Sequence, residues 1–227
     1  MGERRTYMRS NGMLLRIGLA ACLAAPAGLT AQQDAKAIVS RAALAYRSLS
    51  SLRADFDQLI ENQMIGNAAS KGVLVQSGEA RLSMRFSDPP GEAIVIDGRW
   101  VWVYTPSTTP KQVIRLKVPS DPTYGPNLLA WFLTKPTERY SSRFVKSDAV
   151  GGRGVDVVSL TPLDRNLPFS SALVYLDQYD YLPRRLEVKE KSGNLRTLIL
   201  TAVETNRSYP PGIFTFAVPS GVKIIDQ

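Results

Sequence analysis

The sequence predicts a mainly β fold with short helices, in which one antiparallel sheet of about eleven strands curls into a barrel or half barrel. Three observations predict it. Most segments alternate apolar and polar side chains with the period of a strand. Asp97-Gly98 and Lys191-Ser192-Gly193-Asn194 have the composition of hairpin turns. No helical pattern separates successive strands in the manner of a βαβ unit.

Residues 1–31 have the composition of a secretory signal peptide. A basic region ending at Arg16 precedes a run made mainly of Leu, Ile, Ala, Gly and Cys, residues 17–29, which is too short to span a bilayer. We place the cleavage after Ala31, with Ala27 as the alternative. Residues 32–227 are then expected to form one domain, because they contain neither an internal repeat nor an interdomain linker.

A second interpretation of this region depends on its cysteine. Leu19-Ala20-Ala21-Cys22 has the pattern of a bacterial lipobox, and lipidation of Cys22 would anchor the mature protein. However, only residues 17–21 separate Arg16 from Cys22, which is a poor hydrophobic region for such a signal. We therefore favour cleavage after Ala31, which leaves a mature chain without cysteine that can fold in an oxidising compartment.

The composition argues against most catalytic sites. The 227 residues include no histidine and one cysteine. Ser-His-Asp and Cys-His arrangements are therefore impossible, and so are His-ligated and Cys-rich zinc sites. Asp177 and Asp180 flank a turn, where acidic residues usually hydrogen-bond the backbone. No enzyme activity, catalytic residue, metal or cofactor is expected.

The charge is modest. Removal of residues 1–31 lowers the formal net charge from +8 to +5. The basic residues are scattered, and the aromatic residues lie in apolar strands rather than between basic residues, so no nucleic-acid partner is expected.

The predicted elements follow in order. Residues 34–49 have helical spacing, with Ile38, Ala42, Tyr46 and Leu49 on one stripe. After this helix the pattern changes to that of strands. The expected strands cover residues 52–60, 72–76, 81–87, 93–96, 100–105, 112–117, 139–146, 154–160, 172–177, 183–190 and 195–203.

The strand at residues 100–104 is apolar or aromatic at every position. Alternation places Trp100, Trp102 and Tyr104 on one face and Val101 and Val103 on the other. Both faces should therefore be shielded from water. Three large amphipathic aromatic side chains on one face are able to line a core or an apolar cavity.

The segment at residues 119–136 breaks the strand pattern with prolines at both ends. Inside it, Leu128, Leu129, Phe132 and Leu133 recur at helical spacing. Such a short apolar helix is able to cover a space lined by Phe56, Leu82, Met84, Phe86 and the aromatic face of residues 100–104. A filled core with a covering helix explains the same periodicity, and the pattern alone favours that simpler interpretation.

Six short motifs resemble those of the periplasmic outer-membrane lipoprotein carrier family, LolA. They are Phe56-Asp57-Gln58, Gly72-Val73-Leu74, the segment Asp97–Pro106 followed by Lys111-Gln112-Val113, Leu160-Thr161-Pro162, Ser192-Gly193-Asn194, and Phe214-Thr215-Phe216 with Pro219, Gly221 and Val222. They occur in the family's order and cover nearly the whole expected mature chain.

The resemblance implies an incomplete antiparallel barrel with a helical lid over an apolar cavity. It implies a periplasmic carrier, expected to be monomeric, that shields the acyl chains of lipoproteins. The implied partners are acylated lipoproteins, an inner-membrane lipoprotein-releasing ABC transporter and an outer-membrane lipoprotein acceptor. Two alternatives use the same fold: a lipid-sensing regulatory domain and, if Cys22 is lipidated, an anchored acceptor.

One motif departs from the family. Many members carry Arg-Pro after the Gly-x-Leu strand, and that arginine tunes ligand release. Here Gly78-Glu79 occupies those positions, and Arg81 is the nearest arginine. Arg81 is therefore the candidate for tuning release.

Overall fold

The computed structural model describes residues 1–3, 27–64 and 66–227. The strands within them are β1 (Ser51–Glu61), β2 (Ala68–Ser77), β3 (Arg81–Asp88), β4 (Ala93–Ile96), β5 (Trp100–Tyr104), β6 (Gln112–Lys117), β7 (Tyr140–Val150), β8 (Arg153–Pro162), β9 (Phe169–Asp177), β10 (Pro183–Glu190), β11 (Leu195–Thr205) and β12 (Lys223–Asp226). The α-helices are α1 (Ala27–Arg47), α2 (Leu128–Leu133) and α3 (Pro136–Arg139), and two 3₁₀ turns are η1 (Pro122–Tyr124) and η2 (Pro211–Phe214).

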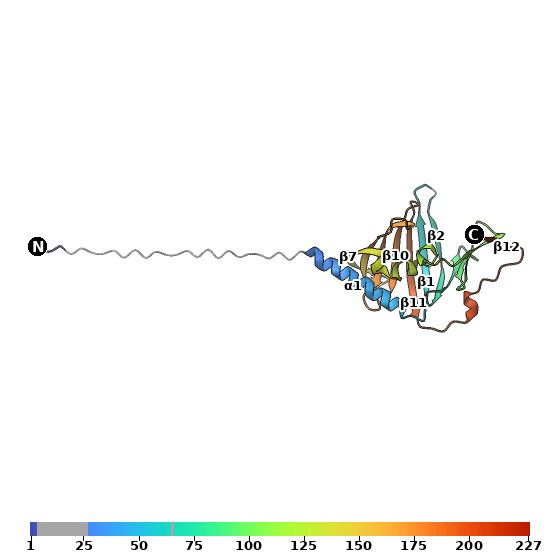
Figure 1. Ribbon diagram of the computed structural model, residues 1–227, viewed down its shortest axis with the longest axis horizontal. Helices are drawn as coiled ribbons and strands as arrows, with labels where there is room; N and C mark the ends of the chain where they lie inside the picture. Colours follow the sequence, from blue (N-terminus) through green and yellow to red (C-terminus); the bar gives the residue numbers. More distant parts are fainter. Residues whose placement is uncertain (4–26, 65) are drawn as a thin grey trace.

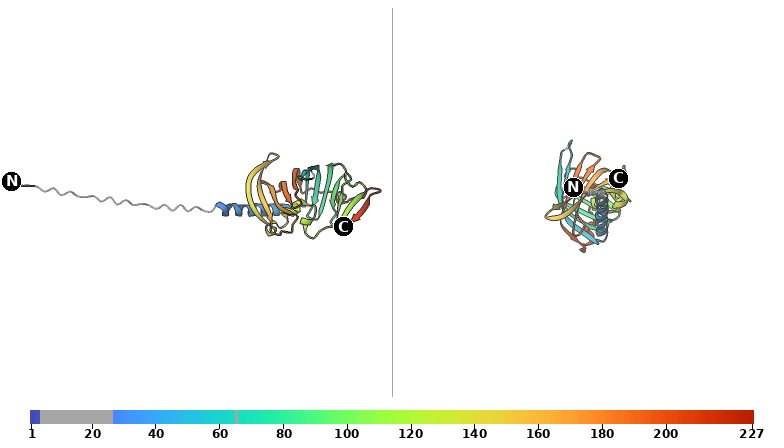
Figure 2. Two further views of the ribbon diagram at one scale, coloured as in Figure 1. Left: turned by 90° about the horizontal axis from the view of Figure 1, so that it is seen from above. Right: turned by 90° about the vertical axis from the view of Figure 1, so that its left-hand side faces the viewer.

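All the strands belong to one sheet, in the order β12-β6-β5-β4-β3-β2-β1-β11-β10-β9-β8-β7. The sheet curls around the helices without closing, because β12 and β7 remain at its two edges (Figure 1). The expected mainly β, incomplete barrel is therefore confirmed. Figure 2 shows the curvature, with α1 lying along the sheet half that contains β7.

The sheet is mixed rather than purely antiparallel. β12, which the sequence did not reveal, pairs with β6 in parallel, and Ile224 lies beside Val113. All four residues of β12 are exposed, so no alternation marks it as a strand. Its pairing depends on backbone hydrogen bonds and on the path by which the chain arrives at that edge.

Helix α1 begins at Ala27 rather than near Asp34. The expected cleavage point after Ala31 therefore falls inside this helix. Residues 4–26 of the expected signal peptide, with Cys22, lie outside the described residues. The expected apolar stripe is present, since Ala42 and Tyr46 are buried and Ile38 packs against the core.

The half of the barrel formed by β7 to β11 has a filled core. Helices α1 and α3 pack against β7, and four aromatic rings meet beneath them. Phe169 stacks on Trp131 with ring centroids 5.6 Å apart and meets Phe132 edge-on at 5.4 Å. The Tyr140 hydroxyl donates to the Trp131 carbonyl at 2.7 Å. Burial of each such ring stabilises the fold by about 2–3 kcal/mol.

The outer face of the sheet, opposite the helices, is crossed by the chain after β11. We call residues 206–222 the C-terminal strap. It leaves β11 where the Asn206 amide donates to the Ser51 carbonyl at 2.9 Å, and Arg85 of β3 donates to the Thr215 carbonyl at 3.0 Å. Phe214 of the strap is buried. The strap thereby carries the chain across the sheet to β12.

The turn between β9 and β10 is held by an ionic cluster. Asp177, whose side chain is 2% exposed, accepts hydrogen bonds from Arg153 and from the Tyr179 and Asp180 amides. Arg184 contacts both Asp177 and Asp180. The two acids therefore serve the turn, in agreement with the simpler interpretation of the sequence.

Candidate functional site

The other half of the barrel, from β11 to β6, encloses a cavity of about 460 Å³. Small-molecule sites usually measure roughly 300–1,000 Å³. The cavity lies between the inner face of the sheet, the segment before α2 and α2 itself. It is lined by Gln58, Leu74, Leu82, Met84, Phe86, Ile94, Val101, Val103, Leu116, Lys117, Pro119, Tyr124, Gly125, Pro126, Asn127, Leu128, Leu129, Trp131, Arg196 and Leu198.

Strand pairing explains why this wall is apolar. Leu82 pairs with Ile96, and Ile96 pairs with Val101 across the Asp97-Gly98 turn. Val101 in turn pairs with Leu116. Directly paired residues share one face of a sheet, so β3, β4, β5 and β6 all direct aliphatic side chains inward. The result is a continuous apolar surface.

Helix α2 forms the cover of this cavity. Asn127 is its N-cap, and the Asn127 side chain accepts a hydrogen bond from the Ala130 amide at 3.2 Å. Leu128 and Leu129 line the cavity. Phe132 and Leu133 point into the filled core and are 0% and 1% exposed. One face of the helix therefore covers the cavity while the other anchors it to the packed half.

A buried polar chain ties α1, β2 and α2 together. The Gln76 amide nitrogen donates to the Tyr46 hydroxyl at 2.5 Å and to the Gly78 carbonyl at 2.7 Å. The Asn127 amide nitrogen donates to the Gln76 carbonyl oxygen at 3.3 Å. Burial raises the pKa of Tyr46 well above its ordinary value, so its hydroxyl stays protonated. We call Tyr46, Gln76 and Asn127 the latch.

A second polar group lies on the opposite side of the cavity, on β1 and β11. Arg196 donates from Nη1 to the Gln58 carbonyl oxygen at 3.3 Å and from Nε to Glu190 at 2.7 Å. Gln58 donates to the Ser70 hydroxyl at 3.1 Å. Arg196 and Gln58 thus bring hydrogen-bonding groups into a mostly apolar wall.

Five of the residues proposed from the sequence line the cavity. They are Leu82, Met84, Phe86, Leu128 and Leu129. Phe56 packs edge-on against Phe86 with ring centroids 5.1 Å apart, and it belongs to the core with Phe132 and Leu133. Contact of any of these residues with a ligand remains a prediction.

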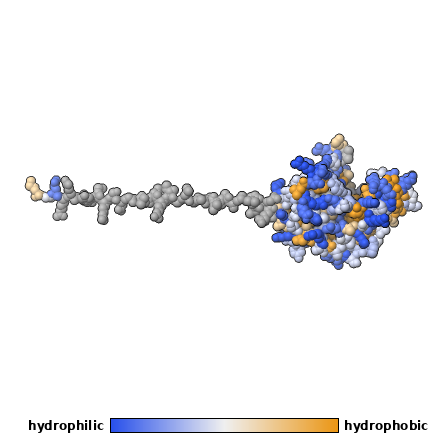
Figure 3. All heavy atoms as spheres, viewed as in Figure 1, coloured by the Kyte–Doolittle hydropathy of each residue, from blue (hydrophilic) through white to orange (hydrophobic). Residues whose placement is uncertain are grey.

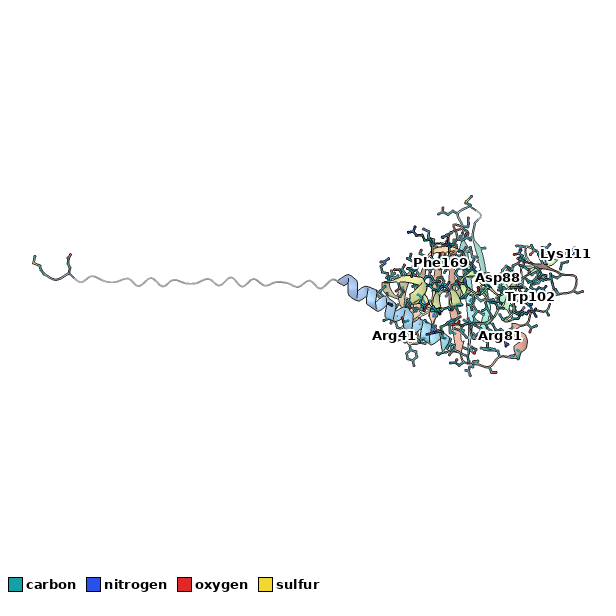
Figure 4. The ribbon with its side chains drawn as sticks, viewed as in Figure 1. Arg41, Arg81, Asp88, Trp102, Lys111 and Phe169 are labelled. Atoms are coloured by element: carbon teal, nitrogen blue, oxygen red, sulfur yellow. The ribbon has the colours of Figure 1, made fainter. Side chains whose placement is uncertain are left out.

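The proposed aromatic wall was wrong. Val101 and Val103 line the cavity, whereas Trp100, Trp102 and Tyr104 lie on the outer face of β5. Trp102 stacks on Phe216 of the strap with ring centroids 5.7 Å apart, and Tyr104 meets the same ring at 5.7 Å. Figure 4 shows Trp102 in the half of the molecule that carries Lys111, and apolar residues gather there in Figure 3.

Arginines complete this outer surface. Arg115 lies over Trp100 at 4.6 Å and over Trp102 at 5.5 Å, and Arg99 also lies over Trp100 at 5.5 Å. Arg115 is paired with Asp226 of β12 through Nε at 2.6 Å. Cation–π contacts and the strap therefore shield the aromatic side chains from water, and they fasten the C-terminus to the sheet edge.

Arg81 is exposed at the start of β3, opposite Ser77, and is not part of the cavity lining. Figure 4 places it at the lower edge of the sheet. Its influence on ligand release stays a prediction.

Several cavity residues were not identified from the sequence. Gln58 and Leu74 were noted only as members of family motifs, Trp131 carried only the general apolar signal of a helix, and Arg196 carried no signal. The inward direction of Val101 and Val103 could have been inferred from the alternation of β3, because Leu82 pairs with Ile96 and Ile96 pairs with Val101.

Two properties of the described residues bear on the class of protein. Among the described residues, no helix combines the length and apolar character needed to cross a membrane. In the same part of the chain, no cluster of acidic or cysteine side chains has the arrangement of a metal site.

Comparison with known proteins places this architecture in a family. The family model for the outer membrane lipoprotein carrier protein LolA matches residues 47–217. The chain belongs to the LolA family. The family is named for a lipoprotein carrier, a protein that binds and transports its ligand.

Individual relatives are distant but match over much of their length. The chain is 26% identical to the outer-membrane lipoprotein carrier protein of Chromobacterium violaceum over 214 residues, 94% of this chain and 96% of the relative. It is 25% identical to the protein of that name in Nitrosospira multiformis, over 78% of this chain and 82% of the relative. The solved structure of an uncharacterized conserved protein from Thermus thermophilus shares the fold, with a TM-score of 0.56, 12% identity and coverage of 86% of this chain and 100% of that protein.

Proposed function

We propose that this protein is a periplasmic carrier that holds the acyl chains of lipoproteins in the cavity beneath α2. It receives them from a lipoprotein-releasing ABC transporter of the inner membrane and delivers them to an acceptor at the outer membrane. The observation that carries the proposal is the cavity itself, which has apolar walls on four neighbouring strands and a cover formed by an apolar helix. Membership of the carrier family supports it.

The physical need for such a cavity is clear. Each methylene group exposed to water costs about 0.8 kcal/mol, so an acylated protein does not cross an aqueous space unaided. Leu82, Met84 and Val103 offer an acyl chain a surface that replaces water. Because α2 covers the cavity, acyl chains enter when α2 moves away, and closure of α2 over the ligand-free cavity opposes their binding.

A charged substitution in the cavity wall tests this function directly. Val103 lines the cavity and is only half-buried, so a charged residue there would meet the ligand more than the core. We expect Val103→Asp to weaken binding of a diacylated lipopeptide at least tenfold, because an unpaired carboxylate among acyl chains costs more than about 1.4 kcal/mol. Its thermal unfolding should stay within a few degrees of the parent protein.

The matched control is Val145→Asp, a valine on β7 that is 40% exposed and distant from the lining. This variant should bind normally. Equal binding by both variants and the parent protein, with folding intact, would exclude the cavity as the acyl site.

An anchored acceptor is the alternative that the sequence itself raises, through Leu19-Ala20-Ala21-Cys22. Mass spectrometry of the mature protein separates the two. A first residue near Gln32 supports the carrier, whereas a diacylglyceryl group on Cys22 identifies an anchored protein.

A further inference from the structure

The cavity wall on β1 and β11 differs from the apolar wall on β3, β4 and β5, since it contains the Arg196 guanidinium and the Gln58 amide. Arg196 is paired with Ile60 of β1 across the sheet, two positions before the cavity residue Leu198. Alternation therefore directs Arg196 to the same inner face as Leu198. The arginine side chain is 28% exposed, so it remains accessible while held by the protein.

Arg196 is fixed in place by partners that are themselves fixed. Glu190 accepts from Arg196 Nε at 2.7 Å and from the Asn194 amide nitrogen at 2.9 Å. Burial opposes ionisation of Glu190, but the bonds from Asn194 and Arg196 hold its pKa below the ordinary value. Arg196 therefore faces a carboxylate on one side and the Gln58 oxygen on the other.

These bonds leave donor capacity on the guanidinium. A guanidinium carries five N–H groups, and the contacts with Glu190 and Gln58 engage Nε and Nη1. Within the described part of the chain, Nη2 meets no hydrogen-bond acceptor. An acyl ligand in the apolar cavity has its hydrogen-bond acceptors where the chains join the rest of the molecule.

We propose that Arg196, oriented by Glu190 and Gln58, forms a subsite that hydrogen-bonds the ester carbonyl oxygens of an acylglyceryl group whose chains occupy the cavity. This inference rests on the proposed acyl-binding function. Glu190 already balances the charge of Arg196 at close range, so the pair favours an uncharged acceptor over a phosphate group. The subsite recognises the linkage of the chains, and the apolar wall recognises the chains themselves.

The test compares two probes that differ at the linkage. The first is an S-(diacylglyceryl)cysteinyl peptide with ester-linked palmitoyl chains, and the second is the same peptide with ether-linked hexadecyl chains. Equilibrium dialysis of isotope-labelled probes gives the dissociation constants. We expect Arg196→Met to weaken binding of the ester probe about tenfold, the effect of losing one hydrogen bond to a charged group, and to change binding of the ether probe less than twofold.

Two further variants control for the loss of charge balance and for nonspecific effects of removing an arginine. Arg196→Met leaves Glu190 unpaired, so the double variant Arg196→Met with Glu190→Gln restores neutrality and should show the same ester-selective loss. Arg143→Met, an exposed arginine of β7 outside the lining, is the matched control and should bind both probes normally. Circular dichroism and thermal unfolding establish that each variant is folded.

Other results would overturn the proposal. Equal weakening of both probes would assign Arg196 to packing, and unchanged binding of both would remove it from the site. Dioleoyl phosphatidylglycerol is measured as a third probe, and a loss of binding confined to it would assign Arg196 to a phosphate instead. Failure of the parent protein to bind either probe would instead contradict the carrier function itself.

Discussion

Removing one residue of the latch should change how easily α2 opens, and this change can be measured. Asn127→Ala removes the N-cap bond to the Ala130 amide and the bond to Gln76, both of which are buried. Loss of an N-cap costs about 1 kcal/mol. Because the Asn127 bond to the Gln76 oxygen is long, at 3.3 Å, leaving that buried oxygen without a donor costs about 1–2 kcal/mol. Because both contacts hold α2 in place, we expect the helix to open more easily by about 2–3 kcal/mol, which corresponds to roughly 30- to 150-fold.

Amide hydrogen exchange measures this opening residue by residue. The Trp131 amide donates to the Asn127 carbonyl at 3.2 Å and the Thr134 amide to the Ala130 carbonyl at 3.1 Å, so both report on α2. Their protection should fall by that factor in Asn127→Ala, whereas Val158 in the filled core of β8 should be affected less. Asn166→Ala, in the loop before β9, is the matched control and should leave α2 unchanged.

The same variant has a consequence for binding. If ligand enters only when α2 is open, a larger open fraction raises the apparent affinity in proportion. Asn127→Ala should therefore bind the diacylated lipopeptide more tightly, through faster association. An unchanged protection of Trp131 and Thr134, or an equal fall in Val158, would refute the latch, and weaker binding with faster exchange would refute its role in admitting ligand.

Three other outcomes are expected. Gly72→Ala should lower the free energy of unfolding in urea by more than about 2 kcal/mol, because its Cβ would lie 2.1 Å from the Arg85 carbonyl oxygen, whereas Gly212→Ala, which meets nothing within 4 Å, should be tolerated. Asp177→Asn should destabilise at pH 7 by about 2 kcal/mol. Burial opposes ionisation there, but Arg153 and two backbone amides lower the pKa of Asp177 to about 2. A carboxyl group whose pKa is lowered in the folded protein stabilises the fold at pH values above its unfolded pKa. The difference in unfolding free energy between parent and variant, measured in urea, should therefore disappear as pH falls from about 4 to 2. A difference that stays constant with pH would contradict this. Lipopeptide should shift the fluorescence of a variant retaining only Trp131, which lines the cavity, and leave one retaining only Trp102 unchanged.

Much of the fold could be predicted because its signals are local. Leu82, Met84 and Phe86 alternate with polar neighbours, and Asp97-Gly98 forms the hairpin between β4 and β5. The parallel strand β12 gave no such signal, since its position depends on the strap that leads to it. Backbone pairing at a distant edge leaves no periodicity in the sequence.

The aromatic strand shows why the site was harder to predict. In β5 every side chain is apolar or aromatic, so no polar residue indicates which face meets solvent. β4, Ala93–Ile96, is apolar throughout and gives no better marker. Trp102 and Tyr104 lie outward, where Phe216, more than a hundred positions later in the chain, covers them. No residue within β4 or β5 decides the orientation. It follows only from the register of these strands against β3, where Leu82 pairs with Ile96, and the family resemblance did not specify it.

The free energies of these interactions indicate how such a carrier can both bind and release acyl chains. Ten methylene groups transferred from water to the cavity would gain about 8 kcal/mol. Closure of α2 through the latch is worth about 2–3 kcal/mol, so it can lower the affinity roughly 30- to 150-fold but cannot expel the chains. Gln76 of the latch also donates to the Gly78 carbonyl at 2.7 Å. A buried neutral amide here links α1 to α2 without a charge, and Arg196 on the opposite wall adds affinity for the linkage. Under the proposed carrier function, release then requires an acceptor whose apolar site binds the chains more strongly, because the lid only tunes the affinity and the difference between the two sites would set the direction of transfer.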